Sequence, residues 1–164
     1  MDTKTQKLMF SSKSDMWGTP GGFFEKLNQT YKFTLDACAS KENHKCEKYY
    51  TIEDDGLSKS WRNEVVFVNP PYSDVGKWVA KAYYESANNG ATVVMLIPSR
   101  TDTKYWHDYI MNAANKIYFI KGRLKFENGS HKVSHAAPFP SALVVFDLGR
   151  FRWSNGPIVK TLER

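Results

Sequence analysis

Two short, continuous apolar runs dominate the hydrophobic pattern of the chain. Residues Val65 to Val68 and Thr92 to Ile97 are rich in β-branched side chains and show no polar alternation. This pattern is typical of strands that are buried on both faces of a parallel sheet. Between them, residues 75–88 carry apolar side chains at helical spacing, and Asn89-Gly90 ends the segment. Strand, helix and strand together predict a right-handed crossover unit.

Weaker patterns extend this unit in both directions. Thr19-Pro20 predicts the start of a helix that reaches about Tyr31, with Thr19 as the N-cap and proline in the first helical position. The other expected elements are short strands at 33–37, 48–51 and 117–120, a helical turn at 40–45, a helix at 102–115, and a late pair of strands at 122–126 and 142–146. Alternating strands and helices predict a layered α/β domain with a mostly parallel sheet.

Composition narrows the class of protein. With 164 residues, 41% hydrophobic and 24% charged, the chain is expected to form one globular domain over residues 16–164, after a loose polar arm at 1–15. No apolar run is long enough to span a membrane. Two cysteines and no secretory segment predict a cytoplasmic protein. Cys38, His44 and Cys46 lack a fourth ligand at a zinc spacing, so no metal is expected.

The charge balance is basic. Lys plus Arg number 23 against 17 Asp plus Glu, which gives a formal net charge of +6. An excess of this size favours a polyanionic partner, although it also serves ordinary solubility. The glycine signatures of dinucleotide-binding and P-loop enzymes are absent from the sequence, so those two classes are disfavoured.

Polar, turn-forming residues follow three of the expected strands. They are Asp36 to Ser40, Asn69 to Tyr72 and Ser99 to Asp102. In open parallel α/β sheets, ligands bind beyond the carboxyl ends of the strands. The sequence therefore predicts a cleft assembled from several strand ends.

The segment Asn69-Pro70-Pro71-Tyr72 is the sharpest chemical signal. Its prolines fix φ, remove two backbone donors and hold the preceding residues extended. The Asn69 amide and the Asn69 and Pro70 carbonyls then form a rigid cluster of acceptors beside the aromatic plane of Tyr72. Such a cluster suits a planar ring that bears an NH2 group. A proline-rich turn with a packed tyrosine is the structural alternative.

An ordered set of motifs resembles a known family. The chain is similar to the phage-type DNA N6-adenine methyltransferases from Trp17 to about Phe146. The segments that carry the resemblance are Trp17 to Pro20, Leu35 to Ser40, Asp55 to Leu57, Asn69 to Tyr72 (the NPPY motif), Trp78 to Ala82, Leu96 to Thr103, Gly122 to Phe126 and Pro138 to Ala142. The NPPY motif alone is shared with methyltransferases that act on RNA guanine or protein glutamine, whereas the ordered set is more specific.

The resemblance implies a fold, a cofactor and roles for residues. It implies the class I, Rossmann-like methyltransferase fold, a mostly parallel seven-stranded sheet with helices on both faces and a late antiparallel hairpin. It implies S-adenosylmethionine bound near Asp36, Ala37, Cys38 and Ala39, beneath an amino-terminal motif of Trp17, Thr19 and Pro20. Those three residues have helix capping and core packing as their alternative role. The ribose acid is Glu42, Asp54 or Asp55, of which Asp55 is preferred.

The resemblance also implies DNA as the partner and adenine N6 as the methyl acceptor. Asn69, Pro70, Pro71 and Tyr72 then form the catalytic motif, and the adenine must leave the duplex to reach them. Arg100, Lys104, Arg123 and Lys125 are the leading phosphate contacts, with a solvated basic face as the alternative. We expect no separate target-recognition domain within these 164 residues. Methylation of RNA or protein glutamine, and an inactive DNA-binding relative, remain alternative functions.

Overall fold

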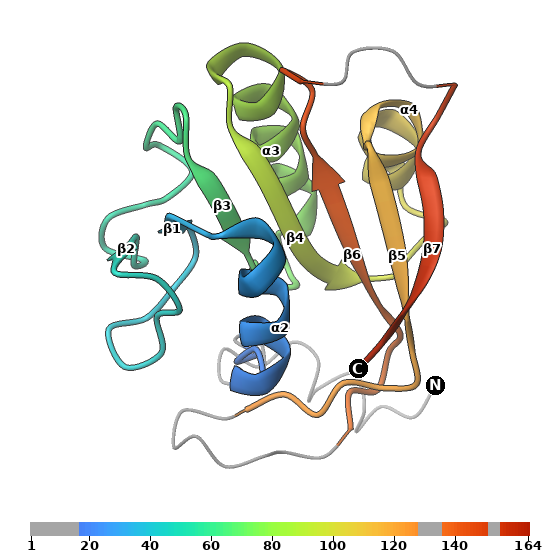
Figure 1. The fold of residues 1–164 in the computed structure, drawn as a ribbon, viewed down its shortest axis with the longest axis horizontal. Coiled ribbons are helices and arrows are strands. Elements are labelled where there is room, and N and C mark those ends of the chain that lie inside the picture. Colours follow the sequence, from blue (N-terminus) through green and yellow to red (C-terminus); the bar gives the residue numbers. More distant parts are fainter. Residues whose placement is uncertain (1–16, 128–135, 151–154) are drawn as a thin grey trace.

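The strands of the protein form one seven-stranded sheet. The computed structural model describes residues 17–127, 136–150 and 155–164, and the predicted arm at 1–15 lies outside them. The strand order is β2-β1-β3-β4-β6-β5-β7 (Figure 1). The strands are β1 (Leu35–Asp36), β2 (Lys48–Tyr49), β3 (Val65–Val68), β4 (Thr92–Pro98), β5 (Lys116–Lys121), β6 (Ser141–Phe146) and β7 (Ile158–Glu163).

The sheet is mostly parallel, with one reversed strand. β2, β1, β3 and β4 pair in parallel, and β7 pairs in parallel with β5. β6 runs antiparallel to both of its neighbours, β4 and β5. This arrangement is the Rossmann-like fold that the resemblance implies, and its late antiparallel pair is β5 with β6. The carboxyl ends of β1, β3 and β4 consequently meet at one edge, where ligands bind in such sheets.

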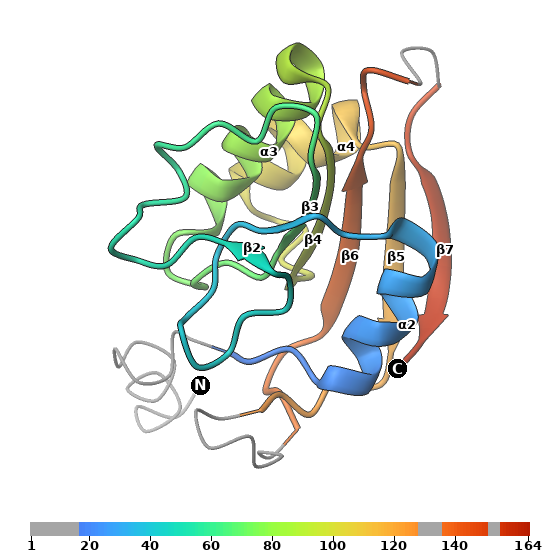
Figure 2. The same cartoon turned by 60° about the vertical axis from the view of Figure 1, so that its left-hand side comes forward.

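Helices cover both faces of the sheet. Figures 1 and 2 show α2 (Gly21–Tyr31) on one face and α3 (Val75–Asn89) with η1 (Trp106–Ile110) and α4 (Met111–Ala113) on the other. Side chains alternate between the two layers along each strand. On the α2 face, the rings of Phe24 and Phe67 meet edge-on at 5.1 Å. On the opposite face, the Trp106 ring stacks on Phe119 at 6.2 Å.

The helix that follows Thr19 starts later than predicted. α2 begins at Gly21, Pro20 occupies the N-cap position, and no side chain of the N-cap bonds to the helix. The expected capping role of Thr19 is therefore wrong. The reason is that the Thr19 hydroxyl is the acceptor for another side chain, Asn69. The free Gly21 N–H is satisfied instead by a distant carboxylate, Glu127 Oε1, at 3.0 Å.

Three further expectations differ from the structure. Residues 122–126 form no strand, because β5 ends at Lys121 and the preceding residues of β5 pair with β6. The expected helical turn at 40–45 is a series of bends. The helix expected at 102–115 contains a π-helical turn, η1, before the short α4. The strand β7 was not expected at all.

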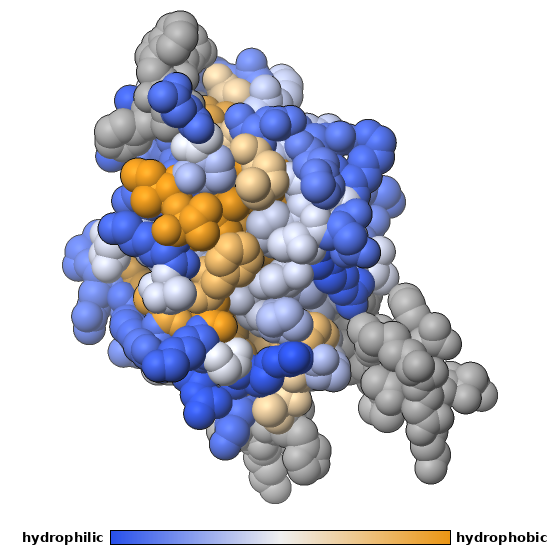
Figure 3. Space-filling model, turned by 90° about the vertical axis from the view of Figure 1, so that its right-hand side faces the viewer, coloured by the Kyte–Doolittle hydropathy of each residue, from blue (hydrophilic) through white to orange (hydrophobic). Residues whose placement is uncertain are grey.

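β7 forms an exposed edge of the sheet. It pairs only with β5 among the described strands, and five of its six residues are exposed. Ile158 and Val159 are 52% and 53% exposed. Figure 3 views the molecule from this side and shows apolar residues gathered between hydrophilic ones. No helix within the described residues is long and apolar enough to cross a membrane.

Candidate active site

Asn69 lies directly after β3 and holds a fixed orientation. Its Nδ2 donates to the Thr19 hydroxyl at 3.0 Å and also to the Trp17 carbonyl. A carbonyl oxygen can only accept a hydrogen bond, so the amide must turn its NH2 group towards Trp17. The Asn69 Oδ1 is buried and has no hydrogen-bond partner among the described residues. A buried acceptor without a partner is costly, which marks this oxygen as one that awaits a donor.

The prolines hold this acceptor in a stiff turn. The Pro71 carbonyl accepts the Asp74 N–H at 3.1 Å, which closes the turn before α3. In the described part of the chain, no backbone N–H donates to the Pro70 carbonyl. Two oxygens, one from a side chain and one from the backbone, therefore stand without backbone donors from the described residues at the end of β3.

Tyr72 is more enclosed than the sequence suggested. Its side chain is 7% exposed, and its hydroxyl is buried without a hydrogen-bond partner among the described residues. Burial raises the pKa of this hydroxyl, against the opposing charge of Arg100. The Tyr72 ring meets Phe139 edge-on at 5.0 Å and lies nearly parallel to the Trp17 ring, at 6.3 Å and 15°. The Trp17 indole is therefore a near-parallel neighbour of the ring that was expected to stack on a base.

Two cavities adjoin the strand ends. The smaller has a volume of about 200 Å³ and contains several of the predicted residues, namely Trp17, Thr19, Asp36, Cys38, Ala39 and Asn69. The larger has a volume of about 730 Å³ and contains Ala37, Cys38, Ala39, Asp55 and Pro71. Cys38, Ala39 and Ser40 line both, so the two cavities adjoin at this loop. Pro20 lines neither cavity and serves α2 instead.

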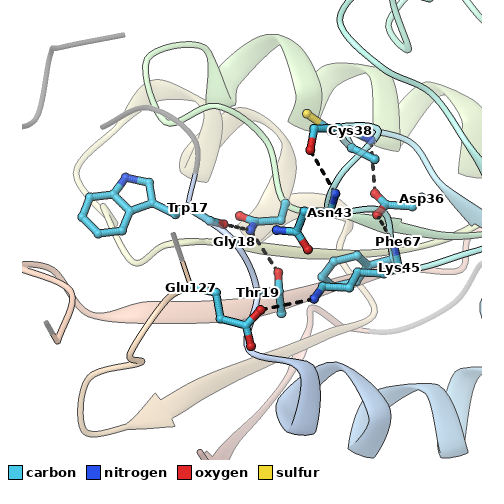
Figure 4. Close-up of a pocket in the computed structure, with 12 residues that line it drawn as sticks. Trp17, Gly18, Thr19, Asp36, Cys38, Asn43, Lys45, Phe67 and Glu127 are labelled. Carbon is cyan, nitrogen blue, oxygen red and sulfur yellow. Dashed lines mark hydrogen bonds and ion pairs between the residues drawn. The ribbon is translucent and has the colours of Figure 1, made fainter. Parts of the chain in front are cut away.

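Asp36 is a buried carboxylate in the wall of the smaller cavity. Asp36 is 3% exposed, and its carboxylate accepts hydrogen bonds from the Lys45 N–H at 2.9 Å and the Cys38 N–H at 3.4 Å. Burial raises the pKa of Asp36 to about 6, while these two N–H groups and the charges of Lys45 and His44 act in the opposite direction. Figure 4 shows Asp36 beside Lys45 and the Trp17 indole pointing away from both.

Several residues of the smaller cavity were missed by sequence reasoning. They are Asn43, Lys45, Phe67 and Glu127. Lys45 and Glu127 form an ion pair at 3.8 Å, and Glu127 also exchanges backbone hydrogen bonds with Gly18. A Cβ atom on Gly18 would lie 2.8 Å from the Glu127 carbonyl, so only glycine permits this close approach. The Trp17-Gly18-Thr19-Pro20 motif is thus held in place by a residue far along the chain.

The larger cavity has apolar walls and an acidic rim. Leu57 and Trp78 supply apolar surface, and Glu42, Glu53 and Asp55 add carboxylates. Asp54 does not line it, because its Oδ2 accepts the Thr51 N–H at 2.9 Å in a local turn that lowers the pKa of the carboxyl. Asp55 adopts a left-handed φ of 54°, and the next residue, Gly56, packs against the Ala37 carbonyl. Of the three candidate ribose acids, Glu42 and Asp55 therefore remain.

The four residues that were predicted to contact DNA differ in their exposure to solvent. Arg100 is half-buried at the end of β4 and close enough to oppose the pKa shift of Tyr72. Arg123 and Lys125 are exposed and alternate with the buried Leu124 and Phe126. Lys104 is exposed, and its ammonium pairs with Asp108.

A family model for DNA N-6-adenine-methyltransferase (Dam) matches residues 5–157. The chain belongs to the Dam family. The match covers the NPPY turn, both cavities and every strand up to β6. The phage-type resemblance recognised in the sequence is thereby confirmed.

Curated relatives agree with this membership. A DNA N-6-adenine-methyltransferase of Haemophilus phage HP1 is 32% identical over 139 residues, which cover 83% of this chain and 80% of the relative. A DNA N-6-adenine-methyltransferase of Escherichia phage T1 is 38% identical over 106 residues, 63% of this chain and 44% of the relative. A putative methyltransferase, YfdM, of Escherichia coli K12 is 37% identical over 65 residues, 35% of this chain and 71% of the relative.

Dam membership implies a methyl donor, and the site fits one that joins a nucleoside to an amino acid. Ligand pockets usually measure about 300 to 1,000 Å³, and the larger cavity falls within that range. Its apolar walls suit a purine, and its acidic rim suits ribose hydroxyls. The smaller cavity supplies a buried carboxylate, Asp36, that would complement an ammonium group. In the described residues, no group of three or more His, Cys, Asp or Glu side chains could hold a metal ion.

Proposed function

We propose that this Dam-family chain transfers the methyl group of S-adenosylmethionine to the N6 amine of an adenine that has left the DNA duplex. The observation that carries the proposal is the pair of acceptors after β3. The buried Asn69 Oδ1 lacks a hydrogen-bond partner among the described residues, and the Pro70 carbonyl lacks a backbone one. An exocyclic amine presents two N–H donors, which matches two such acceptors. Among the substrates that the NPPY motif allows, family membership favours adenine in DNA over RNA or protein glutamine.

The cofactor would be held by both cavities. Asp55 and Glu42 would bind the ribose, Trp78 and Leu57 would contact the adenine of the cofactor, and Asp36 would face the amino-acid end, because these residues line the two cavities. S-adenosylmethionine, when bound, would supply an electrophilic methyl group on a sulfonium, and cleavage of that carbon–sulfur bond in the transfer would leave the neutral thioether S-adenosylhomocysteine. The loop from Cys38 to Ser40, which lines both cavities, would pass beneath the middle of the molecule, where its small side chains permit close approach.

The chain's own contribution is orientation of the amine. Hydrogen bonds from N6 to Asn69 Oδ1 and the Pro70 carbonyl would draw electron density towards the nitrogen and hold its lone pair in line. Neither oxygen is basic enough to remove a proton near neutral pH. The proton on N6 is therefore released to water after the N–C bond has formed. Catalysis by this site consists mainly of orientation and preorganised electrostatics.

The base must come out of the helix to reach these oxygens, at a cost of a few kcal/mol. Stacking on an aromatic side chain recovers about 1–3 kcal/mol of this cost. Tyr72 offers the aromatic plane, and the nearly parallel Trp17 ring lies with its centroid 6.3 Å away. We therefore infer that base entry requires Trp17 to shift from Tyr72 or to open a slot in which the base lies between the two rings.

The test is nucleoside analysis after incubation of the protein with labelled S-adenosylmethionine and DNA of mixed sequence. N6-methyldeoxyadenosine is the expected product, and the Asn69→Ala variant should form none above background. RNA and a glutamine-containing peptide are run in parallel as competing substrates. Label in RNA or peptide but not in DNA would overturn the choice of substrate. The absence of label in every substrate, at low and high salt, would overturn the proposed activity.

A further inference from the structure

The smaller cavity carries opposite charges on neighbouring walls. Asp36 contributes a buried carboxylate, and Lys45 contributes an ammonium whose side chain is 13% exposed. The backbone N–H of Lys45 donates to Asp36 Oδ2 at 2.9 Å, which anchors Lys45 beside the acid. The Lys45 side chain then extends to Glu127 (Figure 4). An acid and a base are thus fixed next to each other by local backbone bonding.

Within the described residues, the ion pair formed by these two groups is the long one between Lys45 and Glu127. Asp36 has no ion pair there, although it is almost completely buried. The Lys45 Nζ stands 3.8 Å from Glu127 Oε2, beyond the range of a normal hydrogen bond. The other oxygen of that carboxylate accepts the Gly21 N–H at 3.0 Å. An ammonium has three donors, so Lys45 retains capacity for a second acceptor in the cavity.

We propose that Lys45 and Asp36 together form a receptor for an amino-acid zwitterion. Lys45 binds the α-carboxylate, and Asp36 binds the α-ammonium, of the methionine part of the cofactor. The inference rests on the proposed function and adds a residue, Lys45, to the binding site. The volume agrees, because about 200 Å³ is too small for the whole cofactor but suits its amino-acid end, and the 730 Å³ cavity shares the loop from Cys38 to Ser40 with it.

The competing role for Lys45 is structural. Lys45 would then serve only to neutralise Glu127, which holds Gly18 and the start of α2. If Lys45 has only a structural role, its replacement should change the affinity for every ligand of the site to the same extent. A lysine that binds the carboxylate would affect only ligands that possess one. The two roles can therefore be distinguished by comparing affinities for ligands with and without a carboxylate, rather than by loss of activity.

The experiment is titration calorimetry with inert ligands and the full chain. S-adenosylhomocysteine has the complete amino-acid end, its decarboxylated analogue keeps only the ammonium, and 5′-methylthioadenosine lacks both groups. Lys45→Met should lower the affinity for S-adenosylhomocysteine by about 10- to 100-fold, which is the loss expected for one charged hydrogen bond. The same variant should bind the decarboxylated analogue and 5′-methylthioadenosine as the wild type does.

A matched control is Lys48→Met. Lys48 lies on β2, lines neither of the two cavities and pairs with Glu64, so its replacement should change no affinity. Equal losses for all three ligands in Lys45→Met, or no loss for any, would overturn the proposal. Should Lys45→Met fail to fold, the wild type decides: it must bind the decarboxylated analogue about 10- to 100-fold more weakly than S-adenosylhomocysteine. If the wild type binds none of the ligands, the proposed function itself fails.

Discussion

The side chains of Asn69 and Thr19 are joined by a hydrogen bond of 3.0 Å, from Nδ2 to the hydroxyl. This bond links the end of β3 to the segment before α2. It occupies the donor half of the amide and so leaves the acceptor half for a substrate. Thr19 is therefore a positioning residue: it touches no reacting atom but sets which way the Asn69 amide faces.

Replacement of Thr19 should slow the reaction without weakening the binding of the cofactor. Thr19→Val keeps the shape of this 2%-exposed side chain but removes the acceptor. Loss of one hydrogen bond of about 0.5–1.5 kcal/mol should lower kcat by about 3- to 10-fold, with little change in KM. Thr19→Ser restores the hydroxyl and should restore kcat. Steady-state kinetics decide, and a Ser variant as slow as Val would show that the hydroxyl has no such role.

Asn69→Ala should abolish most of the turnover and spare the fold. The variant removes the only side-chain acceptor of the proposed pair, whose electrostatic contribution is about 10²- to 10³-fold at comparable sites. Binding of S-adenosylhomocysteine should persist, because both cavities keep their other walls. Single-turnover rates and calorimetry measure the two effects separately. Normal turnover in this variant would remove Asn69 from the mechanism.

Tyr72→Phe should stabilise the protein or leave its stability unchanged. The hydroxyl of Tyr72 is buried without a hydrogen-bond partner among the described residues, and such a group costs about 1–3 kcal/mol. Removal of the hydroxyl should therefore raise the free energy of unfolding by about 1 kcal/mol, while the aromatic plane and methylation are retained. Tyr72→Ala is the contrast, with a loss of about 3–5 kcal/mol and weaker binding of DNA. Denaturant unfolding measures both, and a clear loss of stability in Tyr72→Phe would reveal a partner for the hydroxyl.

The affinity for S-adenosylhomocysteine should rise with pH through about 6. Burial raises the pKa of Asp36 from its ordinary 3.8 to about 6, so the carboxylate that faces the α-ammonium is ionised only above that pH. Binding of 5′-methylthioadenosine should stay flat over pH 5 to 7.5. The charge of His44 also acts on Asp36, so His44→Gln is the control and should keep the rise. A flat profile for both ligands would contradict the role of Asp36.

Asp36 should also make the free energy of unfolding depend on pH. Because its pKa is raised by folding, the contribution of this group to stability is present below pH 3.8 and is lost as the pH rises through about 6. The difference between the two pKa values corresponds to about 3 kcal/mol. Asp36→Asn should therefore be more stable than the wild type above pH 6 and lose this advantage below pH 4. Urea unfolding at several pH values tests the crossover, which would be missing if the carboxylate were ordinary.

Arg123 and Lys125 should act on DNA alone. The double variant Arg123→Gln, Lys125→Gln should raise KM for DNA and lower the salt dependence of binding by about one counterion for each charge. Its affinity for S-adenosylhomocysteine should not change. Lys116→Gln is the control, because Lys116 begins β5 at the opposite edge of the sheet. An equal effect of Lys116→Gln would mean that only net charge matters.

The sequence allowed the core and the acceptors to be predicted but not the contacts between distant segments. β3, α3 and β4 were predicted because their residues are buried in continuous or periodic runs. β7 was missed because Ile158 to Glu163 is mostly exposed and pairs as an edge. A strand was wrongly predicted at 122–126. Its residues alternate between exposed and buried, as in a strand, but they do not join the sheet.

Lys45 and Glu127 show the same limit at the site. Neither lies in a recognisable motif, and their roles depend on a contact across the fold. Thr19 was predicted as a helix cap because local propensity favours that role, whereas the actual partner, Asn69, lies in another element. Local patterns reveal which residues end a strand, but a pairing of distant side chains depends on the folded chain.

The position of β6 has a consequence for the newly made protein. β6 lies between β4 and β5, although it is synthesised after both, so β5 has no neighbouring strand to join until residue 146 has emerged (Figure 1). The Gly18 to Glu127 pairing, which braces the amino-terminal motif, also waits for late residues. Long-range pairings of this kind form slowly. A ribosome-bound chain that stops before β6 should therefore be unable to modify DNA, and methylation would begin only after β6 has been synthesised.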